Sequence, residues 1–127
     1  MKRSIQCLAV LLFAFAVTFG FQVNAASADQ TCQVNVAQPC TETIGNGETL
    51  TARFSNLSDI NVVYQEVSGK PGVVIPVVGS QQYPTINLQP FGIVPESYPT
   101  VGITGAVFTN QSATQGNEIT ITITGNV

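Results

Sequence analysis

The sequence predicts an all-β protein, a single seven-stranded antiparallel sandwich that follows an N-terminal leader helix. Isoleucine and threonine alternate strictly over residues 119–124, which is the period-two pattern of a strand with one buried face. Clusters of Gly, Pro, Asn and Ser separate this run from other apolar runs, and no run after the leader has helical periodicity. The expected strands cover residues 32–36, 50–54, 60–64, 73–78, 86–88, 101–108 and 119–124.

The first 25 residues have the features of a secretory signal peptide. Lys2 and Arg3 precede an unbroken apolar run over residues 7–17, and small residues suitable for cleavage end at Ala25. A retained membrane anchor is the alternative, but a spanning helix needs about 20 apolar residues. We therefore expect residues 26–127 to form one exported domain without a membrane span, destined for the periplasm, the cell surface or the medium.

Two cysteines, Cys32 and Cys40, remain after the leader. An even pair in an exported chain predicts a disulfide that ties the first strand to the turn after it. A redox pair is the alternative, although such pairs are usually two residues apart at the start of a helix.

The charged residues exclude several classes of function. The chain has 4 Lys and Arg, 7 Asp and Glu, and no His. Histidine-dependent nucleophilic catalysis and histidine metal sites are therefore excluded, and the few basic residues argue against nucleic acid as a partner. Glu42 and Glu48 flank a glycine turn and suggest a weak calcium site, for which solvated turn carboxylates are the alternative. We expect no metal, no cofactor and no catalysis.

The number and order of the strands resemble the immunoglobulin-like or fibronectin-III-like sandwiches of bacterial exported proteins. The segment 86–88, followed by Tyr98 within residues 95–101, resembles the E–F corner of those domains. The resemblance implies that the Tyr98 hydroxyl caps this corner. Pro76 interrupts the fourth run, which predicts an edge or bulged strand because proline donates no ladder hydrogen bond.

Two aromatic residues are candidates for contact with a ligand. Tyr83 lies beside Pro84 after two glutamines, and Phe91 lies in the long proline-bounded segment that starts at Pro90. Ordinary packing is the alternative for Tyr83, and a plug of the core is the alternative for Phe91. The stiff segment 90–99 is also the natural candidate if the protein acts as an enzyme or inhibitor through a loop.

The polar face of the last run carries Thr120, Thr122 and Thr124. A solvated sheet face is one interpretation of it. The other is an assembly strand, because an uncharged strand without proline at an unguarded edge pairs readily with other chains. Asn56 and Asn110 fit the N-glycosylation pattern, whose use depends on the source organism.

Together these observations predict a non-catalytic secreted sandwich that acts by surface contact, as an adhesion, envelope or fibre-associated component. Its expected partner is a protein or a cell surface, with self-assembly as one form of that contact. The alternative is a small extracellular module that binds glycan or another ligand through Tyr83 and the Phe91 loop.

Overall fold

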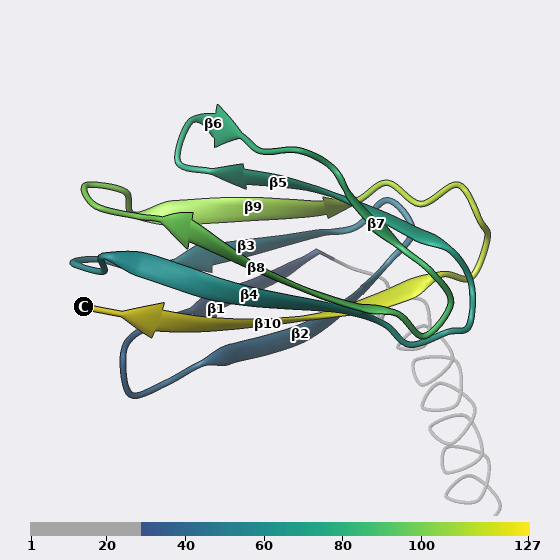
Figure 1. Cartoon of the computed structure of the whole chain (residues 1–127), viewed down its shortest axis with the longest axis horizontal. Coiled ribbons are helices and arrows are strands. Elements are labelled where there is room, and N and C mark those ends of the chain that lie inside the picture. Colours follow the sequence, from purple (N-terminus) through teal and green to yellow (C-terminus); the bar gives the residue numbers. More distant parts are fainter. Residues whose placement is uncertain (1–28) are drawn as a thin grey trace, which may run out of the picture.

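The computed structural model describes residues 29–127, and the predicted signal peptide lies outside this range. The described chain is all β, with ten strands in two sheets (Figure 1). The strands are β1 (Gln30–Gln33), β2 (Cys40–Gly45), β3 (Thr49–Arg53), β4 (Asp59–Glu66), β5 (Gly72–Val78), β6 (Gln81–Gln82), β7 (Ile86–Leu88), β8 (Ile93–Pro99), β9 (Gly105–Asn110) and β10 (Glu118–Asn126). No helix within these residues is long and apolar enough to cross a membrane.

The two sheets are joined in a nested order. The six-stranded sheet runs β1-β3-β9-β5-β6, with β7 also paired to β5, and the four-stranded sheet runs β2-β10-β4-β8. The antiparallel pairs β2–β10, β3–β9, β4–β8 and β5–β7 match early strands with late strands in reverse order. From β2 to β5 and from β7 to β10, each strand lies in the sheet opposite the one before it. This is the winding of a jelly roll.

The predicted sandwich is confirmed, but its immunoglobulin-like order and its count of seven strands are wrong. β2 was not predicted because Glu42 occupies the inward position between buried Cys40 and Ile44. This charged residue interrupts the alternation of apolar and polar side chains. β8 was not predicted because Pro95 and Pro99 suggested an irregular loop.

The prolines fit in β8 because it is an edge strand. The flanking even-numbered residues Gly92 and Thr100 make the backbone hydrogen bonds toward the β4 side. Because orientation alternates along a strand, the odd-numbered prolines turn their missing donors away from β4.

Pro76 is accommodated in another way. β5 lies inside its sheet, paired with β9 on one side and with β6 and β7 on the other. The carbonyl of Pro76 accepts a hydrogen bond from the Tyr83 N–H between these two short partners. The missing N–H of Pro76 faces the same gap, so the prediction of an edge strand is wrong but no bond to β9 is lost.

The facing sides of the two sheets form one apolar core. Its largest fully buried apolar side chains include Tyr64, Phe108 and three isoleucines of β10. The predicted disulfide between Cys32 and Cys40 is present, with the two Cα atoms 6.1 Å apart. It links β1 to β2, the outermost strands of the two sheets, and so closes one side of the sandwich.

The prediction of an unguarded edge at the last strand is wrong. β10 pairs with β2 on one side and with β4 on the other along most of its length. Thr120, Thr122 and Thr124 lie on its outward side, where Thr120 bonds Thr43 and Thr122 bonds Thr41 through their hydroxyls. The threonines therefore form part of a sheet face, and Thr120 and Thr122 are paired on both sides, whereas Thr124 is paired with β4 alone.

Candidate functional site

Of Tyr83 and Phe91, the two aromatic residues predicted to contact a ligand, Phe91 is the more exposed. Its side chain is 69% exposed, so it does not plug the core. Its φ of 58° lies in the left-handed region, which only one other non-glycine residue among the described ones adopts. A bulky residue in this region is strained, and such strain persists only where the surroundings hold it.

The buried carboxylate of Glu66 is one of the groups that hold Phe91. Glu66 ends β4 and is fully buried. Its Oε1 accepts hydrogen bonds from the backbone N–H groups of Phe91 at 3.1 Å, Gly69 at 2.7 Å and Lys70 at 3.0 Å. One carboxylate oxygen thus connects the turn after β4 to the loop before β8.

The other oxygen, Oε2, is equally well occupied. It accepts from the backbone N–H of Ser68 at 2.9 Å, from the Ser68 hydroxyl and from Asn117 Nδ2 at 3.1 Å. Burial alone raises the pKa of Glu66, but these hydrogen bonds outweigh it and lower the pKa to about 2. The carboxylate therefore stays charged and bonded across the ordinary pH range.

A buried polar network extends from this carboxylate through the β9–β10 loop. Asn117 bonds Asn110, whose amide also donates to the carbonyl of Ile44, and both asparagines are buried. Ser112 donates to both asparagines and accepts from the N–H of Val73. The β4–β5, β7–β8 and β9–β10 connections are thus linked to one another through Glu66 and this network.

The Phe91 ring itself lies against Gly69. A Cβ added at Gly69 would come within 2.9 Å of the ring, and Gly69 also has a positive φ. Glycine therefore satisfies both the turn geometry and the space that the ring needs. We call Phe91, Gly69 and the Glu66 carboxylate beneath them the Phe91 platform.

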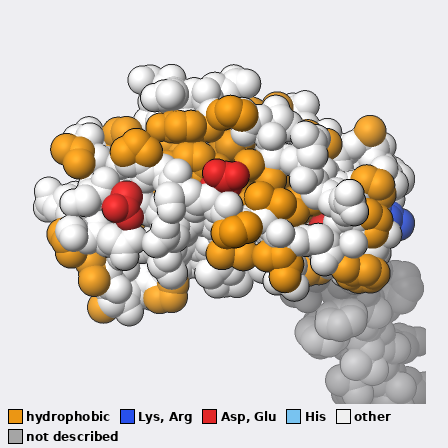
Figure 2. Space-filling view, viewed as in Figure 1, with side chains coloured by type: hydrophobic (Ala, Val, Ile, Leu, Met, Phe, Trp, Pro, Cys, Tyr) orange, Lys and Arg blue, Asp and Glu red, His pale blue; other side chains and the backbone are white. Residues whose placement is uncertain are grey.

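The platform adjoins the outer face of the four-stranded sheet. One row across this face is formed by Thr43, Thr120, Gln65 and Ile93, which pair in that order. Ile93 is 59% exposed and extends the apolar surface of the platform onto the sheet. Charged side chains are few on the surface seen in Figure 2. The row offers two hydroxyls and an amide beside an apolar end.

Tyr83 lies elsewhere. It is half-buried, its ring meets that of Tyr98 edge to face at 4.8 Å, and both line a cavity of about 180 Å³ together with Glu96. Tyr98 lies near the end of β8, whereas Phe91 precedes its start, so about 20 Å of strand separate the two predicted contacts. Tyr83 and Phe91 therefore do not share one site.

The predicted corner role of Tyr98 is not what the structure shows. Its hydroxyl bonds the hydroxyl of Tyr64 at 2.8 Å inside the sandwich. Burial raises the pKa of Tyr98 in spite of this bond, and burial together with the bond raises the pKa of Tyr64. The pair therefore acts as a neutral cross-link between β4 and β8.

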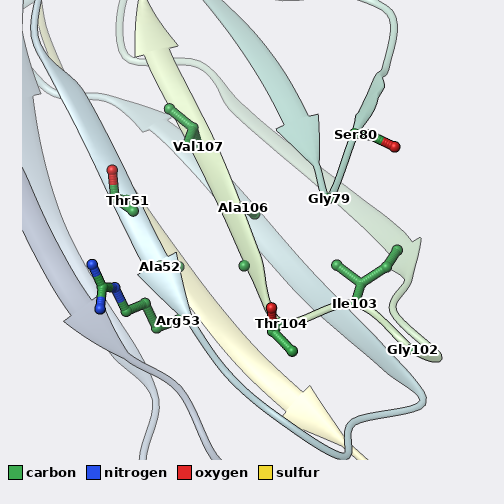
Figure 3. A pocket seen from close by; sticks show the side chains of 11 residues that line it. Thr51, Ala52, Arg53, Gly79, Ser80, Gly102, Ile103, Thr104, Ala106 and Val107 are labelled. Carbon is green, nitrogen blue, oxygen red and sulfur yellow. The ribbon is translucent and has the colours of Figure 1, made fainter.

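An open groove lies on the outer face of the six-stranded sheet. The groove has a volume of about 680 Å³. Its lining residues, shown in Figure 3, include Thr51 and Arg53 of β3, Ile103 and Thr104 before β9, and Ser80 after β5. Arg53 also lines an adjoining hollow of about 290 Å³ over β1. The volume of the groove lies within the range of about 300–1,000 Å³ that is common for ligand clefts.

Glu48, which the sequence proposed with Glu42 as a weak calcium site, is buried at the β2–β3 turn. Its Oε1 accepts from the Gly45 N–H at 2.6 Å, while its Oε2 has no partner. No group of three or more acidic, Cys or His residues within 29–127 is placed to hold a metal ion. The role of Glu66 was missed, since a lone glutamate at the end of an apolar run gives no signal of the donors that later surround it.

The chain resembles known proteins in its fold. No family model and no curated protein matches the sequence. A structure of the CBM51-2 and INT domains of Clostridium perfringens ZmpB is similar, with a TM-score of 0.51 and 3% identity over 65% of this chain and 22% of that one. The family GH115 4-O-methyl-α-glucuronidase BtGH115A has a TM-score of 0.47 and 13% identity over 68% of this chain. The chain spans 14% of the length of that enzyme, and these likenesses concern the fold alone.

Proposed function

We propose that this chain is a non-catalytic secreted module that binds neutral polysaccharide through the Phe91 platform. The observation that carries the proposal is the strained, exposed phenylalanine held by a buried and fully bonded carboxylate. Strain of this kind is concentrated at ligand clamps and active sites, and a preorganised contact loses little conformational freedom on binding.

The chemistry of the neighbouring row supports a sugar as the ligand. A pyranose ring has apolar C–H faces and a polar rim of hydroxyls. Phe91 and Ile93 offer apolar surface for a ring face, while Gln65, Thr120 and Thr43 offer an amide and hydroxyls for the rim. The lack of charge along this row favours a neutral glycan over an ionic one.

Secretion is part of the proposal and is supported by the Cys32–Cys40 disulfide, since such bonds persist in oxidising compartments. The fibre form of surface contact has lost its main support, because β10 is paired on both sides. A non-catalytic role is supported by the state of the Glu66 carboxylate of the platform, which is buried and has both oxygens occupied by hydrogen bonds from within the chain.

The test is binding of the purified domain to a panel of neutral polysaccharides (cellulose, xylan and mannan) by affinity electrophoresis. We expect retardation by at least one of them, lost in Phe91→Ala and kept in Val36→Ala. Val36 is the matched control because it is 59% exposed and lies in the connection between β1 and β2. Absence of binding to the whole panel, or equal binding by both variants, would contradict the proposal.

A further inference from the structure

We propose that the groove on the six-stranded sheet is a second site, which binds the carboxylate of a uronic-acid unit in an acidic polysaccharide. It lies on the opposite outer face from the Phe91 platform and does not depend on it. Three features of the groove support this assignment: a guanidinium and hydroxyls that have no hydrogen-bond partner among residues 29–127, and an open floor.

The guanidinium of Arg53 is one of two cationic side chains in residues 29–127, and it is exposed. Among those residues it makes no hydrogen bond or ion pair. No Asp or Glu lines either the groove or the adjoining hollow, although acids outnumber bases in the chain. A planar guanidinium binds a carboxylate through two parallel hydrogen bonds, which a lysine ammonium does not reproduce.

The groove also offers hydroxyls that the fold does not use. Thr51, Ser80 and Thr104 line it, and none of their hydroxyls has a hydrogen bond within the described chain. In Figure 3 these residues come from β3, from the turn after β5 and from the loop before β9. Hydroxyls beside a cation suit a ligand that bears both a carboxylate and hydroxyls, which describes a uronic acid better than a peptide terminus.

A glycine opens the floor. Gly105 pairs directly with Arg53 across the β3–β9 ladder, where a side chain of β9 would otherwise stand beside the guanidinium. A Cβ there would approach the Ala52 carbonyl at 3.2 Å and would lie in the groove lining. The absence of this side chain keeps the face of β9 open beside Arg53, whose guanidinium points away from β9 in Figure 3, toward the adjoining hollow over β1, while Ile103 lines the groove on the other side.

The experiment is calorimetric titration of the domain with oligogalacturonate at low salt. Two comparison ligands identify the chemistry that is recognised: the methyl ester of the same oligomer, and a short neutral peptide with a free C-terminal carboxylate. We expect binding of the free oligomer only, weakened at least tenfold in Arg53→Gln and partly restored in Arg53→Lys. Lys70→Gln is the matched control, because it removes the other cation, whose ammonium bonds the Gln115 carbonyl outside the groove.

Equal binding of the ester, preference for the peptide, loss in Lys70→Gln, or no binding of the oligomer would each overturn the inference. Thermal melts of the variants verify folding, which Arg53→Gln should not change because the side chain is exposed and unpaired. Phe91→Ala is expected to leave this titration unchanged, so failure here and failure of the platform proposal are separable.

Discussion

Two buried glutamates at the same end of the sandwich have opposite environments. Glu66 ends β4 and accepts six hydrogen bonds from five residues, whereas Glu48 accepts one and leaves Oε2 without a partner. The sequence neighbourhood accounts for this, since the turn after Glu66 folds back so that its N–H groups point at the carboxylate. The comparison indicates that Glu66 organises the loops, whereas Glu48 satisfies only its own turn.

The largest effect is expected from removal of the Glu66 carboxylate. Glu66→Ala leaves the buried amide of Asn117 and four half-buried backbone N–H groups without this acceptor, and an unsatisfied buried donor costs about 1–3 kcal/mol. We expect the free energy of unfolding in urea to fall by about 3 kcal/mol or more. Glu48→Ala is the control and should lose about 1 kcal/mol, because only the Gly45 N–H loses its acceptor. Equal losses in the two variants would contradict the difference between these carboxylates.

The contribution of the Cys32–Cys40 disulfide to the free energy of unfolding can be compared with that of the Glu66 hydrogen bonds. The ring between Cys32 and Cys40 is short, so the chain-entropy model predicts a loss of about 2–3 kcal/mol when both cysteines become alanine. Urea unfolding of this double variant should therefore give a smaller loss than Glu66→Ala. A larger loss would mean that the covalent link contributes more to stability than the Glu66 hydrogen bonds.

Low pH removes the charge of the Glu66 carboxylate without any change in the sequence. The pKa of Glu66 falls from 4.5 to about 2 on folding, so its contribution is complete above pH 4.5 and is lost as the pH falls toward 2. Urea unfolding between pH 6 and pH 2 should show this decline in the wild type. Glu66→Gln carries no titrating group at this position, so its decline over the same range should be shallower. Parallel curves would count against the lowered pKa.

Glu48→Gln is expected to have the smallest effect. The change keeps the volume and leaves Oε1 free to accept from Gly45, while the unpartnered oxygen becomes an amide nitrogen. We expect the free energy of unfolding to stay within about 1 kcal/mol of the wild type. A loss near that of Glu66→Ala would show that Oε2 has a partner after all.

The sequence allowed the sandwich, the disulfide and the alternating face of β10 to be predicted, because period-two patterns and paired cysteines report on local structure. It did not allow the jelly-roll order to be predicted, because nested pairing depends on contacts between distant strands such as β2 and β10. β8 was not predicted as a strand, because whether a strand tolerates proline depends on whether it lies at the edge of its sheet.

The candidate site was predicted less well than the fold. Phe91 could be singled out from its position between prolines, although its exposure could not. Tyr83 was paired with it on residue type alone, and the structure separates the two along β8. Arg53 could not be singled out from the sequence, because the hollow around it arises where three segments distant in the sequence meet.

The most direct test of the platform is the variant Phe91→Gly, measured for both stability and binding. Glycine adopts a positive φ freely, which relieves about 1–2 kcal/mol of strain and offsets its extra entropy in the unfolded chain. We predict that the free energy of unfolding is kept or slightly raised, while retardation by the neutral polysaccharide is lost. A less stable protein that still binds the polysaccharide would contradict the account.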